Sequence, residues 1–244
     1  MKSRELNNLP AYIYLDRKQV KVINLEGISI MTPETNEKSN IHLINVPSEN
    51  VEDIFRVAIN SLNNGKNLLK YAGSVEIVII QAQEFFVIPE LGIAGSAIGK
   101  SCIEIKIDFS RKDLNKIIEV EIPATIYHEL SHLVRENKLE CRNTLLESMV
   151  SEGIACYIEK SVFSREIPYI LPIKDEDSFW STAKEFFDDS NYNHAIWFFG
   201  SGSLPKWIGY RLGYILVEKY MQKNNKVLSE LCIIPSQEIL FTKP

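Results

Sequence analysis

The chain has 244 residues, of which 45% are hydrophobic and 24% charged, as is typical of a globular protein with one large core. Its formal net charge of −5 provides no overall basic surface, so we expect no nucleic-acid partner. No apolar run reaches the length of a membrane span, and the N-terminus lacks the apolar segment of a secretory signal. These features favour a cytoplasmic protein without a membrane partner, and they leave the oligomeric state open.

The first half of the chain predicts a sheet with one helix. Apolar residues recur at helical spacing after Pro47-Ser48, whereas Ile103–Phe109 alternates apolar and polar residues as a strand with one wet face does. This polar alternation suits a strand at the sheet edge. The predicted elements are strands at 11–15, 20–25, 75–80 and 103–109, a helix at 51–62 that stops near Asn64-Gly65, and loops at 31–40 and 89–99.

The second half is mainly helical. Amphipathic patterns predict helices at 123–135, with Pro123 in the first turn, at 145–155 and at 207–220. The residues from Met221 onward predict a short helical addition. We therefore expect an α+β fold with two parts, 1–120 and 121–244, that form one unit.

The helix at 123–135 contains the string His128-Glu129-Leu130-Ser131-His132. Two histidines four residues apart lie on one helix face, one turn from each other, where both imidazoles can bind the same zinc ion. Glu129 lies beside such a metal rather than on it, and can take a proton from a bound water. The pattern predicts a zinc peptidase with His128 and His132 as ligands and Glu129 as general base.

Glu152, on the next predicted helix, is the expected third ligand. A helix–loop–helix after His132 can return this carboxylate to the histidine face and leave the fourth metal position open. The neighbouring Gly153 costs about 1 kcal/mol in a helix interior, relative to alanine. It therefore predicts close packing, for which an approach of the two metal-bearing helices is one reason.

Other residues compete for the third position. Glu147 lies on the same helix as Glu152 but faces elsewhere, and a distant His194 is the alternative third ligand. A third histidine would suit a DNA-associated metalloprotease, against which the acidic balance and the lack of a basic segment argue. His42 has no predicted partner and is interpreted as incidental.

Three blocks of the sequence resemble the bacterial predicted zinc-dependent proteases of the YjaZ type. They are TIYHELSHLVR (125–135), LLESMVSEGIACYIE (145–159) and WFFGSGSLPKWIGYRLGYILVEKY (197–220). The first two also resemble the wider gluzincin clan. The resemblance implies a zincin-like fold, Zn²⁺ as cofactor, peptide or protein substrates, His128, His132 and Glu152 as ligands, and Glu129 as base. Gluzincins often place an aspartate four residues after the ligand glutamate to orient a histidine, but this chain has Cys156 there, so that partner is unassigned.

Peptide hydrolysis also needs a hydrogen-bond donor for the oxyanion. We predict Tyr210 for this role, with Tyr214 and Arg211 as alternatives on the same helix. The strand 103–109, as a sheet edge, would pair with an extended substrate, and the loop 92–99 would shape the cleft.

The main alternative to an enzyme is an inactive or non-proteolytic zinc-binding regulatory module. Closed structural zinc sites prefer four protein ligands rich in cysteine, and no cysteines cluster near His128. Because Glu129 is also present, the sequence favours the peptidase.

Overall fold

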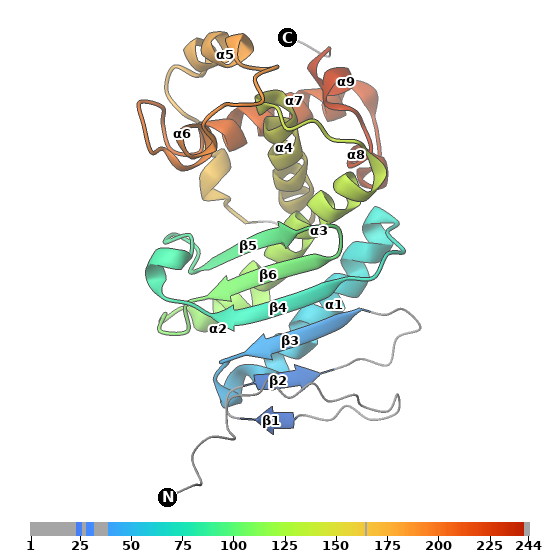
Figure 1. The fold of residues 1–244 in the computed structure, drawn as a ribbon, viewed down its shortest axis with the longest axis vertical. Coiled ribbons are helices and arrows are strands. Elements are labelled where there is room, and N and C mark those ends of the chain that lie inside the picture. The colour runs from blue at the N-terminus through green and yellow to red at the C-terminus, as the bar shows by residue number, and fades with distance from the viewer. Residues whose placement is uncertain (1–22, 26–27, 32–38, 164, 242–244) are drawn as a thin grey trace, which may run out of the picture.

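The computed structural model describes residues 23–25, 28–31, 39–163 and 165–241 of an α+β protein. Figure 1 shows a sheet in the lower half of the molecule and a group of helices above it. The predicted strand 11–15 and most of the predicted loop 31–40 lie outside the described residues. None of the described helices is long and apolar enough to cross a membrane.

The strands form one mixed sheet. Its described strands are β1 (Ile23–Leu25), β2 (Ile28–Met31), β3 (Asn40–Ile44), β4 (Glu76–Gln81), β5 (Ile93–Ile98) and β6 (Cys102–Ile107). Their order is β1-β2-β3-β4-β6-β5. β3, β4 and β6 are parallel, whereas β1 to β3 pair antiparallel and β5 runs antiparallel to β6. β5 and β1 are therefore the edge strands of the described sheet, and β5 is the one at the edge nearest the upper group of helices (Figure 1).

The four predicted helices are confirmed, and several short ones join them. The described α-helices are α1 (Val51–Leu69), α2 (Leu114–Lys116), α3 (Ile122–Lys138), α4 (Leu145–Val162), α5 (Glu176–Glu185), α6 (His194–Phe199), α7 (Ile208–Asn224), α8 (Leu228–Leu231) and α9 (Ser236–Leu240). α1 does not stop at Gly65, because this glycine lets the helix pack closely on α3. A Cβ there would lie 3.0 Å from Leu130 Cδ2. α1 ends instead at Leu69 and is capped by Lys70, which lies in the left-handed region with φ 50°.

One face of the sheet is covered by α1 and α3 and carries the core. Ile77, Ile79 and Ile105 on this face are completely buried. On the opposite face of β6, Glu104 and Lys106 are partly exposed. The predicted edge position of 103–109 is wrong, since β6 lies between β4 and β5. Apolar and polar residues alternate along β6 because one face of the sheet is covered by helices and the other is open to water.

The edge strand beside the helices, β5, lies inside the segment 89–99 that was predicted as a loop. Gly92 and Gly99 flank β5 with positive φ of 71° and 58°, so they turn the chain as glycines in loops do. Gly95 serves another purpose within the strand. A Cβ there would lie 2.5 Å from Thr125 Cγ2 and 2.6 Å from Glu129 Oε1. Glycine is therefore what allows the edge strand to lie directly on α3.

The C-terminal segment is held against the long helices by a buried arginine. Arg135 on α3 is 1% exposed and pairs through Nε with Glu147 Oε1 of α4 at 2.7 Å. Its Nη1 donates to the carbonyls of Cys232 and Ile234, at 3.2 and 2.8 Å. The predicted helical addition is confirmed as α8 and α9, and it is anchored to the helices that carry the candidate site.

Arg135→Met is expected to destabilise the fold by about 3–5 kcal/mol, because it leaves Glu147 buried without its partner. Denaturant unfolding measures this loss, and limited proteolysis should show earlier release of the C-terminal segment. The control is Arg56→Met, which removes two ion pairs between half-exposed side chains, to Asp53 and Glu119. It should leave the free energy of unfolding nearly unchanged. Equal stability of the two variants would contradict the anchoring role.

Candidate metal centre

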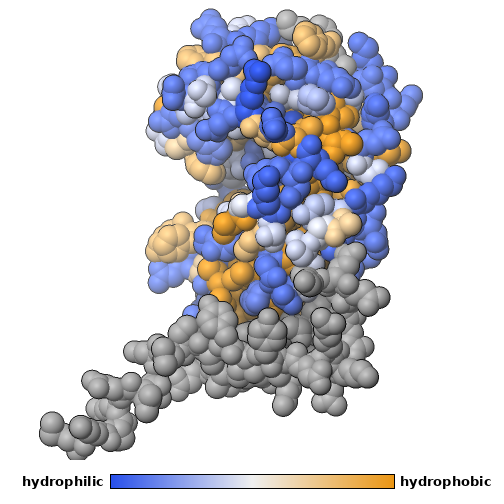
Figure 2. All heavy atoms as spheres, turned by 45° about the vertical axis from the view of Figure 1, so that its right-hand side comes forward, coloured by the Kyte–Doolittle hydropathy of each residue, from blue (hydrophilic) through white to orange (hydrophobic). Residues whose placement is uncertain are grey.

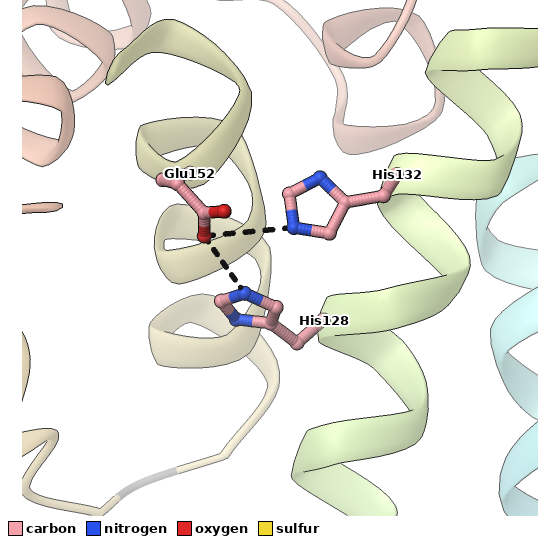
Figure 3. A group of neighbouring side chains, drawn as sticks. All are labelled: His128, His132 and Glu152. Carbon is pink, nitrogen blue, oxygen red and sulfur yellow. Dashed lines mark hydrogen bonds and ion pairs between the residues drawn. The ribbon is translucent and has the colours of Figure 1, made fainter. Parts of the chain in front are cut away.

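His128, His132 and Glu152 converge on one point. The two histidines project from neighbouring turns of α3, and Glu152 reaches them from α4, as Figure 3 shows. Glu152 Oε2 lies 3.1 Å from His128 Nε2 and 3.5 Å from His132 Nε2. One ligand atom from each residue lies within 4.8 Å of the other two.

This donor set fits a divalent ion such as zinc. Two ligand atoms at 2.0–2.1 Å from a tetrahedral zinc are about 3.3 Å apart, and the two measured distances lie on either side of that value. Two imidazoles and one carboxylate are also the ligand types of zinc sites that keep one position open. The alternative ligands lie elsewhere among the described residues: Glu147 pairs with Arg135, and His194 is outside the converging group.

Burial and charge act against each other at these ligands. Burial lowers the pKa of His128, but hydrogen bonds to Glu152 and Glu159 outweigh it and raise that pKa well above its usual value. Burial raises the pKa of Glu152, but the two histidines outweigh it and lower that pKa. The three side chains thus form a compact group in which the Glu152 carboxylate stays ionised beside the histidines. A metal that binds there displaces the proton held by His128, because an imidazole binds a metal only in its neutral form.

Glu129 lies beside this group and is 7% exposed. Burial raises the pKa of its carboxyl group, while His128 and His132 act in the opposite direction. The backbone N–H of Ala97 on β5 also lowers the pKa of this carboxyl group. A buried carboxylate with a raised pKa, fixed between a helix and a sheet edge, is suited to accepting and returning a proton.

Each histidine is oriented by a second partner. His128 Nδ1 lies 3.1 Å from Glu159 Oε2, and His132 Nδ1 lies 2.9 Å from Ser151 Oγ. Metal-binding histidines almost always have such partners, which fix the ring and its tautomer. The nitrogens facing Glu152 are thereby left available for a metal.

Glu159 is itself held by a buried network. It is completely buried, accepts a hydrogen bond from the Tyr169 hydroxyl at 2.8 Å and pairs with Arg165. Arg165 in turn pairs with Glu121 Oε2 at 2.7 Å. The sequence prediction left this orienting partner unassigned, because only the position four residues after Glu152 was considered. Glu159 is seven residues after Glu152, which also returns to the same helix face.

Glu159→Ala is expected to weaken zinc binding by about 10–100-fold, because the ring of His128 loses its anchor. Glu159→Gln should lose less, since an amide oxygen can still accept from Nδ1–H. A competitive zinc titration measures both, with Glu185→Gln, an exposed carboxylate on α5, as the control. Wild-type affinity in Glu159→Ala would show that Glu159 only contributes to packing.

A cleft of about 500 Å³ lies over the metal-ligand group. β5 lines one side of it and residues of α4, α6 and α7 line the other, and the molecular outline in Figure 2 is notched between the sheet and the helices. Tyr210 of α7 lines the cleft. Tyr214, by contrast, donates a hydrogen bond to Glu218, and Arg211 donates one to Glu176. Burial, and then the charge of Glu152, raises the pKa of the Tyr210 phenol well above its usual value. The structure therefore brings Tyr210 to the site and leaves its two alternatives outside.

His194 also lines the cleft, although it lies outside the converging group. Its ring stacks on Phe198 at 4.4 Å, and its Nδ1 lies 3.3 Å from the Tyr192 hydroxyl. His42 lies on β3 and pairs with Glu76 Oε2 at 2.7 Å. The prediction that His42 has no partner is therefore wrong. The residue lies on the open face of the sheet and does not line the cleft.

Comparisons with known proteins agree with this geometry. A family model described as "Predicted Zn-dependent protease (DUF2268)" matches residues 60–241. This range contains every member of the metal-ligand group, together with Glu129, Glu159 and Tyr210. No curated protein and no solved structure matches the chain significantly. The resemblance to the YjaZ-type proteases is confirmed, and the chain belongs to this family of predicted zinc-dependent proteases.

Proposed function

We propose that this protein is a zinc peptidase of zincin-like fold, in which His128, His132 and Glu152 hold the metal. The observation that supports it best is the convergence of two imidazoles and a carboxylate at zinc spacing, with Glu129 adjacent. The sheet part and the helical part would act as one catalytic unit, because the cleft takes residues from both.

Zinc held there would polarise the scissile carbonyl and acidify a water molecule. The Glu129 carboxylate accepts a proton from the attacking water and passes it to the leaving amine. The Tyr210 hydroxyl donates a hydrogen bond to the carbonyl oxygen as negative charge builds there. None of the hydrogen bonds among the described side chains involves this hydroxyl, which is consistent with a donor reserved for substrate.

The edge of β5 is suited to binding the substrate backbone. Ile88 N–H donates to the carbonyl of Ile93 at 3.1 Å on the side of β5 that faces away from β6. Strand alternation places the backbone N–H and C=O of Gly95 on that same side. An extended peptide can pair with these groups whatever its sequence. The substrate-pairing role predicted for residues 103–109 is thus reassigned to β5.

A digest of unstructured peptides tests the proposal. Zinc-loaded protein should cleave members of a peptide mixture, a chelator should stop cleavage, and added zinc should restore it, as mass spectrometry would show. Zinc binding at one equivalent without cleavage of any peptide would instead favour the alternative, a non-proteolytic zinc-binding module.

A further inference from the structure

One end of the cleft is apolar, in contrast to its polar centre. Phe86 and Ile88, from the segment before β5, line it on the sheet side, and Phe199, the last residue of α6, lines the cleft from the helical side. Phe86 and Phe199 are each 58% exposed. Large apolar side chains left in water inside a concave site are typical of positions that contact an apolar ligand group.

An ion pair holds the segments that carry these two aromatic residues beside each other. Lys206 Nζ lies 3.3 Å from Glu90 Oε1 and joins the loop after α6 to the segment before β5. Gly200, next to Phe199, packs against Lys206, whose Cα would lie 2.8 Å from a Cβ built on that glycine. Glu90 lies in the chain between Ile88 and Leu91, which both line the cleft. The ion pair therefore joins the two walls beside the aromatic side chains.

We propose that this end of the cleft is a specificity subsite that takes one large apolar side chain, aromatic or branched aliphatic, of the peptide substrate. The inference rests on the proposed peptidase function and adds to it the class of side chain selected. Phe86 and Phe199 contact that side chain and lose their exposure to water when the peptide binds. A charged side chain would lose its hydration against these rings without gaining a partner.

Matched peptides test the subsite through hydrolysis. Peptides that carry Phe, Leu, Ala or Asp at each position around the cleaved bond are compared by kcat/KM. The wild type should prefer Phe or Leu over Ala at one position by about 10–200-fold. Phe86→Ala and Phe199→Ala should each reduce that preference about tenfold, mainly through a higher KM for the Phe and Leu peptides.

The control is Phe241→Ala, which removes an 81% exposed phenylalanine outside the cleft and should keep the full preference. The absence of any apolar preference, or the same preference in all three variants, would overturn the subsite. All three substitutions are at exposed positions, so the fold should survive them.

Binding to Glu129→Gln protein loaded with zinc separates the subsite from catalysis. Fluorescence anisotropy should show tighter binding of the Phe peptide than the Ala peptide, and Phe86→Ala in this background should remove the difference. If the Phe peptide binds more tightly and Phe86→Ala removes the difference, but the wild type cleaves no peptide, the peptidase proposal fails and the subsite stands. If the wild type cleaves peptides but binding does not distinguish Phe from Ala, the subsite fails and the peptidase stands. No binding of either peptide also overturns the subsite.

Discussion

Glu129→Gln is expected to lower peptide hydrolysis by about 10²–10⁴-fold while zinc affinity stays at the wild-type level. Glutamine has nearly the shape of glutamate, so it fits the space that Glu129 occupies beside Gly95. It has no carboxylate to accept a proton from water. The metal-ligand atoms belong to other residues and remain in place.

Steady-state hydrolysis of one identified peptide, with zinc content measured on the same samples, checks this result. Glu140→Gln, an exposed carboxylate after the end of α3, is the control and should keep full activity. Wild-type turnover in Glu129→Gln would remove Glu129 from the role of base.

The second large effect is on stability, at the crossing of α4 and α7. A Cβ on Gly213 would lie 1.8 Å from the carbonyl oxygen of Met149, and a Cβ on Gly153 would lie 2.3 Å from the Gly213 backbone. The backbones of the two helices are therefore in direct contact. Because no side chain can move aside to relieve the clash, even one methyl group must separate the helices.

Gly213→Ala is expected to destabilise the protein by about 3 kcal/mol or more, as overpacking at a rigid contact does. Helix propensity alone predicts the opposite sign, a gain of about 1 kcal/mol. Glu152 directly precedes Gly153, so zinc affinity should fall together with stability. Denaturant unfolding and zinc titration measure the two effects.

The matched control is Gly202→Ala in the loop before α7. A Cβ there would lie 3.1 Å from the flexible side chain of Ile196, which can move aside. Its unfolding free energy should change little. Stabilisation by Gly213→Ala would contradict the close crossing of the helices.

The sequence predicted the elements of the site better than their surroundings. The string His128–His132 lies on α3 as expected, and Glu152 returns from α4 to the same point, because local periodicity defines both helices. Gly153 was correctly predicted to pack closely, but its partner is α7 rather than α3. A helical pattern shows that a face is buried without identifying the element that covers it.

The errors concern features that depend on contacts distant in sequence. The segment of β5 resembled a loop in sequence because it contains three glycines. Gly92 and Gly99 form the turns on either side of the strand, and Gly95 allows the strand to contact α3. Glu159 was missed because the sequence does not distinguish a buried glutamate from one in water. Its partner Arg165, which also pairs with Glu121, reaches it only in the folded chain. Such pairings depend on the completed fold.

Zinc stoichiometry and affinity of the wild type, Glu152→Ala and His194→Ala test the metal centre most directly. We expect one equivalent of zinc in the wild type, wild-type affinity in His194→Ala, and strongly reduced affinity in Glu152→Ala. Tight zinc binding by Glu152→Ala together with loss of zinc from His194→Ala would contradict the assignment of the third ligand.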